Sequence, residues 1–183
     1  MKVIALRGKC NTGKSDSLKR LIQMLSCKET KVLAFGLLQP VNKDDAPKII
    51  TDIAICAQNA RSFNGDVFVV IDYKGVCVGI STQGDDRYWL EKAYERICNS
   101  IKETIPKEIP DIFVCAIRSY GGTNDFVAGV CTEHPVIIYD KASIETIGDM
   151  DDLGAIETEQ TKLNCMQAQI LFDYLEKLIS CGG

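Results

Sequence analysis

The chain has 183 residues and a formal net charge of −4, with 46% hydrophobic and 25% charged residues. These proportions are typical of a globular protein with a core of its own, and we expect a single domain over residues 1–183. The negative charge excludes a global positive field that would attract nucleic acid or an anionic membrane.

Nine cysteines are scattered along the chain, and no two of them form a C-x-x-C pair. An odd number at this spacing indicates neither a disulfide framework nor a zinc site. The sequence has no apolar core of a signal peptide and no apolar run of membrane length. We therefore predict a cytoplasmic protein with reduced thiols.

The first half of the chain alternates strand and helix patterns. Val3 to Leu6 is a short apolar run typical of a buried parallel strand. A loop to Gly13 follows, and then a helix whose apolar residues are Leu18, Leu21, Ile22 and Leu25. Lys31 to Leu38 predicts a second strand, and residues 47–62 have a helical pattern.

A hairpin is expected next, because two strand-like runs at 67–73 and 76–81 flank the turn pair Lys74-Gly75. It predicts one antiparallel strand toward an edge of the sheet.

The second half continues the alternation. We expect a helix at 87–103, a buried strand at 112–117, a polar loop at 118–125, a strand at 136–139 and a last helix at about 160–179. Strands that alternate with helices predict a three-layer α/β sandwich with a mainly parallel sheet.

One motif carries chemistry, and it lies between the first strand and the first helix. It is a complete G-x-x-x-x-G-K-S, formed by Gly8, Lys9, Cys10, Asn11, Thr12, Gly13, Lys14 and Ser15. Glycines let such a loop turn its backbone N–H groups onto phosphate oxygens, and the start of the helix adds partial positive charge. Lys14 is placed to contact the β- and γ-phosphates, and the Ser15 hydroxyl to reach Mg²⁺.

On this motif the chain resembles the P-loop NTPase superfamily, and the resemblance is specific over residues 3 to 25. It implies a site for Mg²⁺ and a nucleoside triphosphate, ATP or GTP, held by residues 8–15. It also implies an acid at the end of a neighbouring strand that helps to order the metal.

Two aspartates are candidates for that acid. Asp72 follows four apolar residues in the Walker B pattern, and Asp85 follows the strand that ends at Ser81. If strands 76–81 and 112–117 run parallel to the first strand, residues after both open onto the phosphate edge of the sheet. Asp85 is then favoured for catalysis and the metal, and Asp72 is a turn residue. A simple βαβ step into strand 67–73 would instead make that strand parallel.

Arg118 follows a buried strand at the same edge, where a guanidinium can stabilise transition-state charge. The alternative is a surface arginine that opens a loop. Thr123 and Asn124 in that loop are further candidates for substrate contact.

A guanine-specific switch has weaker support. Ser81 stands where the D-x-x-G motif of GTPases needs its aspartate, and the N-K-x-D letters of residues 42–45 come too early in the chain. We expect ATP binding with γ-phosphoryl transfer or hydrolysis, served by Lys14, Arg118 and Asp85, with Ser15 and Asp85 at the metal. A small-molecule or nucleotide kinase, a GTPase-like switch, a partner-dependent ATPase and a non-catalytic nucleotide sensor stay open.

Overall fold

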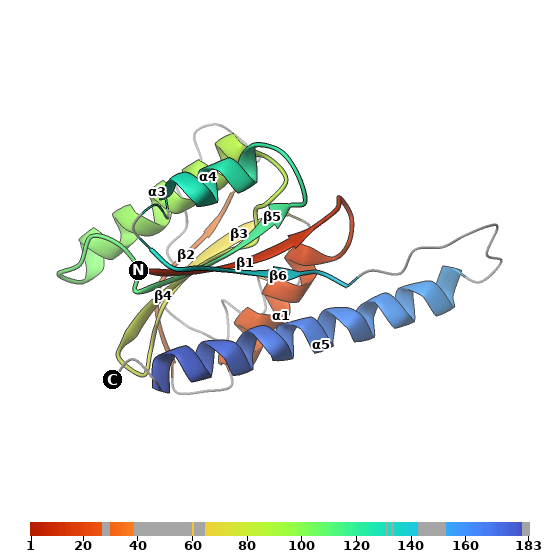
Figure 1. Cartoon of the computed structure of the whole chain (residues 1–183). Helices are drawn as coiled ribbons and strands as arrows, with labels where there is room; N and C mark the ends of the chain where they lie inside the picture. Colours follow the sequence, from red (N-terminus) through yellow and green to blue (C-terminus); the bar gives the residue numbers. More distant parts are fainter. Residues whose placement is uncertain are drawn as a thin grey trace.

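The computed structural model describes residues 1–26, 30–38, 60, 65–130, 132, 134–142 and 153–180. Over these residues the chain forms an α/β fold with one six-stranded sheet (Figure 1). The strands are β1 (Lys2–Gly8), β2 (Thr30–Leu37), β3 (Val67–Tyr73), β4 (Val76–Ser81), β5 (Ile112–Arg118) and β6 (Val136–Asp140). The helices are α1 (Lys14–Ser26), α3 (Arg87–Thr104), α4 (Gly122–Val130) and α5 (Leu153–Ser180).

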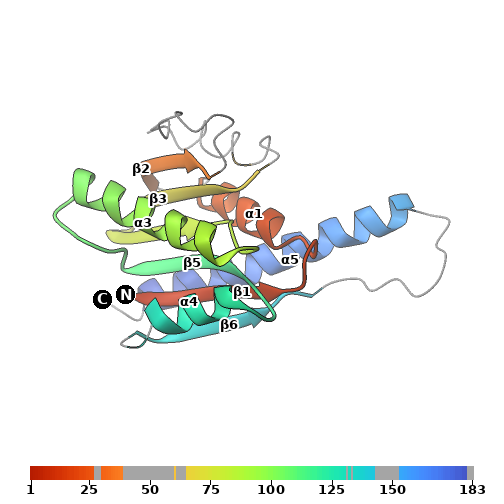
Figure 2. The same cartoon turned by 90° about the horizontal axis from the view of Figure 1, so that it is seen from above.

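The strand order is β2-β3-β4-β5-β1-β6, which Figure 2 shows from above. β1 pairs in parallel with both β5 and β6, and β4 pairs in parallel with β5. β3 is antiparallel to both of its neighbours, β2 and β4. The predicted class is therefore confirmed: a mostly parallel sheet in which the hairpin contributes one reversed strand.

The reversed strand has a direct consequence for the edge of the sheet at which β1, β4 and β5 end. Strand β3 begins at that edge, because it runs the opposite way. Residues just before β3 thus lie beside residues that follow β4, as the hydrogen bond from Thr82 Oγ1 to Asp66 Oδ1 (2.8 Å) shows. The hairpin turn at Lys74-Gly75 lies at the other edge, with both residues at positive φ.

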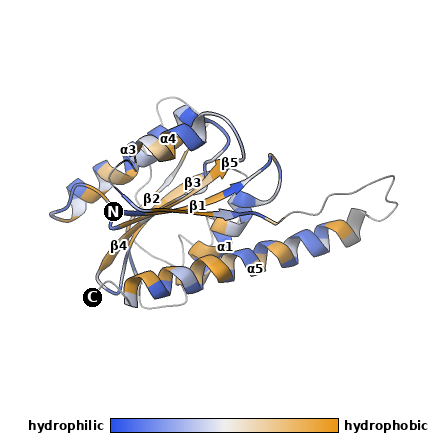
Figure 3. Ribbon diagram, in the orientation of Figure 1, coloured by the Kyte–Doolittle hydropathy of each residue, from blue (hydrophilic) through white to orange (hydrophobic). Residues whose placement is uncertain are grey.

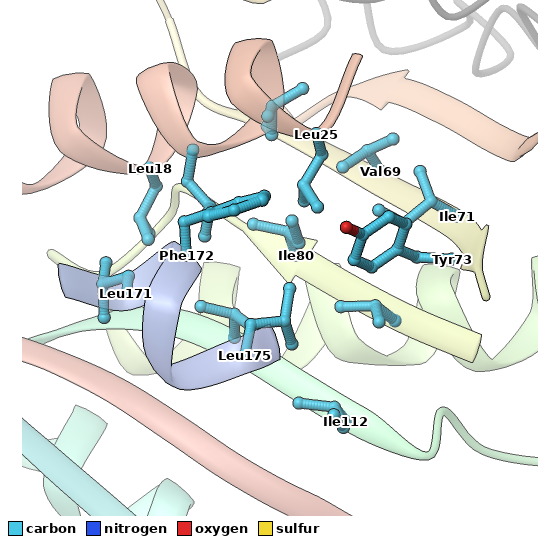
Figure 4. Packing of buried hydrophobic residues seen from close by; sticks show 14 of the residues in the cluster. Leu18, Leu25, Val69, Ile71, Tyr73, Ile80, Ile112, Leu171, Phe172 and Leu175 are labelled. Atoms are coloured by element: carbon cyan, nitrogen blue, oxygen red, sulfur yellow. The ribbon is translucent and has the colours of Figure 1, made fainter. Parts of the chain in front are cut away.

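Helices cover both faces of the sheet and make three layers. α1 and α5 pack on one face, and α3 and α4 on the other (Figure 1). Apolar and hydrophilic residues alternate along α5 (Figure 3), and Ala168, Leu171 and Leu175 among the apolar ones are fully buried. Leu18 and Leu25 of α1 meet Leu171 and Leu175 of α5 over the sheet in a buried cluster (Figure 4). Burial of such side chains stabilises the fold by about 1.5–3 kcal/mol for each.

Several predicted boundaries are wrong. The polar loop expected at 118–125 already contains the start of α4, because Phe126 and Val127 are buried against the sheet and fix a helix there. The last helix begins seven residues before position 160, at Leu153. Three sequence features lie outside the described residues. They are the expected helix at 47–62 (except position 60), the N-K-x-D letters at 42–45 and the cysteines at 27, 56, 131 and 181.

None of the helices in the described ranges combines the length and the apolar character that crossing a membrane requires.

Candidate functional site

The loop between β1 and α1, which we call the Gly8–Ser15 loop, has an unusual backbone. Asn11 and Gly13 have φ values of 56° and 78°, in the left-handed region. Glycine enters this region without a steric penalty, and asparagine tolerates it better than most residues. The chain therefore turns sharply before α1, whose first-turn N–H groups lack partners within the helix.

Helix α5 braces this loop from a distant part of the chain. A side chain at Gly13 would collide with Asn164, since a Cβ atom would lie 2.5 Å from its Oδ1. Gln160 Nε2 donates to Thr12 O (3.2 Å), and Asn164 Nδ2 donates to Asp16 Oδ2 (2.8 Å). Sequence reasoning missed both amides. The available signal was Asn164, a polar residue among the apolar positions of the last helix, which is only 5% exposed.

Lys14 lies at the centre of the site and is 5% exposed. Its Nζ donates to the carbonyl oxygens of Gly8 (3.1 Å) and Lys9 (2.6 Å), at the start of the loop. Burial lowers the pKa of Lys14 below its ordinary value, and the negative charge of Asp85 acts against this shift. The ammonium group is thus a partly desolvated charge held by main-chain acceptors that an anion can replace.

Ser15 faces a carboxylate that the sequence analysis did not consider. Its Oγ lies 3.1 Å from Asp66 Oδ1 and 3.0 Å from Thr82 O. Thr82 Oγ1 donates to the same Asp66 oxygen (2.8 Å) and accepts from Val67 N (2.9 Å). Asp66 reaches the Gly8–Ser15 loop because it directly precedes the reversed strand β3. Only the direction of that strand could have revealed it.

Asp85 and Arg118 lie together beside Lys14. Asp85 Oδ1 is 3.8 Å from Lys14 Nζ and 3.4 Å from Arg118 Nε. Arg118 Nη2 contacts Cys10 Sγ at 3.2 Å. Asp85 follows Gly84, where a Cβ atom would lie 2.5 Å from the Ala116 carbonyl carbon of β5. The close approach of Gly84 to β5 thus brings the predicted residues Asp85 and Arg118 to one place.

Other sequence candidates have structural partners instead. Asp72 lies in the hairpin at the opposite edge of the sheet, where its Oδ1 accepts from Gly75 N (2.9 Å). Thr123 Oγ1 accepts from Arg118 N (3.0 Å), and Asn124 Nδ2 donates to Arg118 O (2.8 Å). Asp72 therefore closes a turn, while Thr123 and Asn124 fix the backbone from which Arg118 projects.

The loop, the start of α1 and the end of the β4–α3 connection enclose a pocket of about 310 Å³. Its lining consists of Asn11, Thr12, Gly13, Lys14, Ser15, Asp16, Gly84 and Asp85. Main-chain amides and an ammonium group suit an anion. Within the described ranges, His, Cys, Asp and Glu side chains nowhere gather in a group of three or more that could hold a metal ion. A cation here would need further ligands from a bound molecule or from water.

The fold and the pocket define an α/β protein with a mixed, mostly parallel six-stranded sheet and a polar site at the junction of β1 and α1. Comparisons with protein-family models, with curated proteins and with solved structures gave no match.

Proposed function

We propose that this protein binds a Mg²⁺–nucleoside triphosphate, ATP foremost, in the Gly8–Ser15 loop and transfers or hydrolyses its γ-phosphoryl group, as P-loop NTPases do. The observation that carries the proposal is a G-x-x-x-x-G-K-S loop that turns through left-handed Asn11 and Gly13 between a buried strand and a helix start. The lysine of this loop, Lys14, borders the pocket of about 310 Å³.

The proposed phosphate contacts follow from the donors present. The N–H groups at the start of α1 and the helix dipole favour an anion at the mouth of the loop. Lys14 supplies three further donors and a full positive charge. Since its present acceptors are neutral carbonyl oxygens of Gly8 and Lys9, phosphate oxygens would give it stronger, charge-assisted hydrogen bonds.

The residues on the Ser15 side fit a magnesium ion. Three oxygen ligands lie together here: the Ser15 hydroxyl, the Asp66 carboxylate and the Thr82 carbonyl. The Asp66 and Thr82 oxygens are 3.1 and 3.0 Å from Ser15 Oγ. Asp66 is better placed than Asp85 for this role, because Asp66 is the carboxylate that contacts Ser15. When bound, Mg²⁺ neutralises charge on the phosphate oxygens.

Arg118, which lies beside Asp85 near Lys14, is the group that we assign to the terminal phosphate. The Arg118 side chain is 34% exposed, and its buried Nε has no hydrogen-bond partner among the described residues. A planar guanidinium can form paired hydrogen bonds to two phosphate oxygens. Lys14 and Arg118 would therefore stabilise charge that develops during phosphoryl transfer.

The test combines binding and turnover. Calorimetric titration with MgATP and MgGTP, followed by assays of phosphate release, should give saturable binding, tighter for ATP, and slow phosphate release. Release that increases with a small-molecule acceptor indicates a kinase, and release without one indicates an ATPase. Absence of binding heat for both triphosphates would contradict the proposal.

A further inference from the structure

Asp85 places a negative charge between two cationic groups of the site. Its carboxylate lines the pocket and lies 3.8 Å from the ammonium of Lys14 and 3.4 Å from Nε of Arg118. The same Asp85 oxygen, Oδ1, also lies 4.0 Å from Cys10 Sγ. The neighbours of Asp85 are thus the groups that are assigned to phosphate, whereas Asp66 is the carboxylate beside Ser15.

These contacts are loose. Charge-assisted hydrogen bonds between nitrogen and oxygen normally measure about 2.7–2.9 Å, and both ion-pair distances of Asp85 exceed that range. The Asp85 side chain is also 51% exposed. A carboxylate held this way is weakly bound to its partners and can turn into solvent without a burial penalty.

We propose that Asp85 is a built-in counter-anion of the site, which partly neutralises the charges of Lys14 and Arg118 in the nucleotide-free protein and competes with the terminal phosphate for them. This inference rests on the proposed function. It replaces the sequence-based assignment of Asp85 to the metal with a different role: Asp85 lowers the affinity for triphosphate and keeps two like charges together until the ligand arrives.

The competition is physically reasonable because the same positions attract any anion. Lys14 and Arg118 are both positive, and each opposes the approach of the other unless a negative charge lies between them. The Asp85 carboxylate supplies this charge from the protein itself. A terminal phosphate carries more negative charge and more acceptor oxygens, so it can take over both partners.

The decisive experiment measures ATP affinity by calorimetry in EDTA, where no metal role can contribute. We expect Asp85→Asn to bind ATP about fivefold more tightly than the wild type, because an exposed ion pair contributes only a small interaction free energy. Asp85→Glu keeps the charge and should not show this gain. Asp125→Asn removes an exposed charge on α4 outside the pocket and should leave the affinity unchanged.

The same variants are then titrated with a non-hydrolysable ATP analogue in magnesium, where Asp85→Asn should keep its gain. If Asp85→Asn binds ATP no more tightly than a wild type that does bind it, the counter-anion role is wrong and the proposed function stands. A loss of affinity in magnesium would make Asp85 a metal-side group and would also overturn the inference. If the wild type binds no triphosphate at all, the proposed function itself fails. Asp85→Ser provides a second carboxylate-free variant should Asp85→Asn fold poorly by circular dichroism.

Discussion

The edge of the sheet where β1 ends and the edge at the hairpin turn contain similar residues, but these residues make different contacts. At the edge where β1 ends, the second half of the Gly8–Ser15 loop and Asp85 line a pocket, with Asp66 in contact with Ser15 and Arg118 beside Asp85. At the hairpin edge the charges pair among themselves, as in the Lys74–Glu176 and Lys107–Asp111 ion pairs of 2.6 and 2.5 Å.

Both edges also contain a turn with left-handed residues, but only one of them precedes a helix. The hairpin turn satisfies its own backbone, because Asp72 accepts from Gly75 N. The Gly8–Ser15 loop leads into the first turn of α1, which offers unpaired N–H groups. If the Gly8–Ser15 loop binds an anion as proposed, a helix start and a cation are needed in addition to the turn geometry that both edges share.

Thiol reactivity should differ most strongly between the edges. Cys77 of the hairpin is 3% exposed, and burial raises its pKa to about 11. At pH 8 its thiolate fraction is about a hundredfold smaller than in the unfolded chain, so labelling should be slower by at least that factor. Cys10, which is exposed in the loop, should be labelled in the folded protein and protected by MgATP. Peptide mapping after alkylation measures both; fast labelling of Cys77 in the folded state would contradict the structure at this edge.

Replacing Lys14 should have the largest effect on ligand binding. Lys14→Ala removes the charged donor of the loop, and we expect ATP affinity to fall on the order of 50-fold, since hydrogen bonds of charged groups are the strong ones. The matched control is Lys74→Ala, which removes a lysine at the hairpin edge. Calorimetry with MgATP compares the two variants, and equal affinities would remove the distinction between the edges.

Asp66, just before β3, and Asp72, near the end of β3, offer a sharper comparison because they lie at opposite ends of one strand. Asp66→Asn should weaken MgATP binding about tenfold, as expected when a carboxylate near a metal is neutralised, and should have little effect in EDTA. Asp72→Asn should leave the affinity unchanged in both conditions. A larger loss from Asp72→Asn would mean that the metal side lies elsewhere.

The brace from α5 should give the smallest effect of the four. Asn164→Ala removes the amide that packs on Gly13 and holds Asp16, and we expect a loss of about fivefold in ATP affinity from a loosened loop. Gln169→Ala changes an exposed amide on the same helix that pairs only locally with Asp173 and serves as the control. ATP titrations of both variants, together with their thermal unfolding midpoints, would separate an effect on loop placement from an effect on stability. Equal ATP affinities of the two variants would show that α5 does not position the loop.

The local features of this protein could be predicted from short sequence patterns. Residues 3–26 specify a buried strand, a glycine-bracketed loop and an amphipathic helix, because each depends on neighbours within a few positions. The hairpin at Lys74-Gly75 was likewise predictable from its turn residues, and the predicted alternation of strands and helices gave the α/β class.

The side chains that surround the loop come from distant parts of the chain, and their identity depends on how the whole fold packs. Asp66 reaches Ser15 because β3 runs against its neighbours, and Asn164 reaches Gly13 and Asp16 from a helix 148 residues beyond Asp16. Asp85 was expected at this edge, but its cationic partners depend on how Gly84 packs against β5. Strand direction and helix docking follow from the burial of the whole core, and no local pattern encodes them.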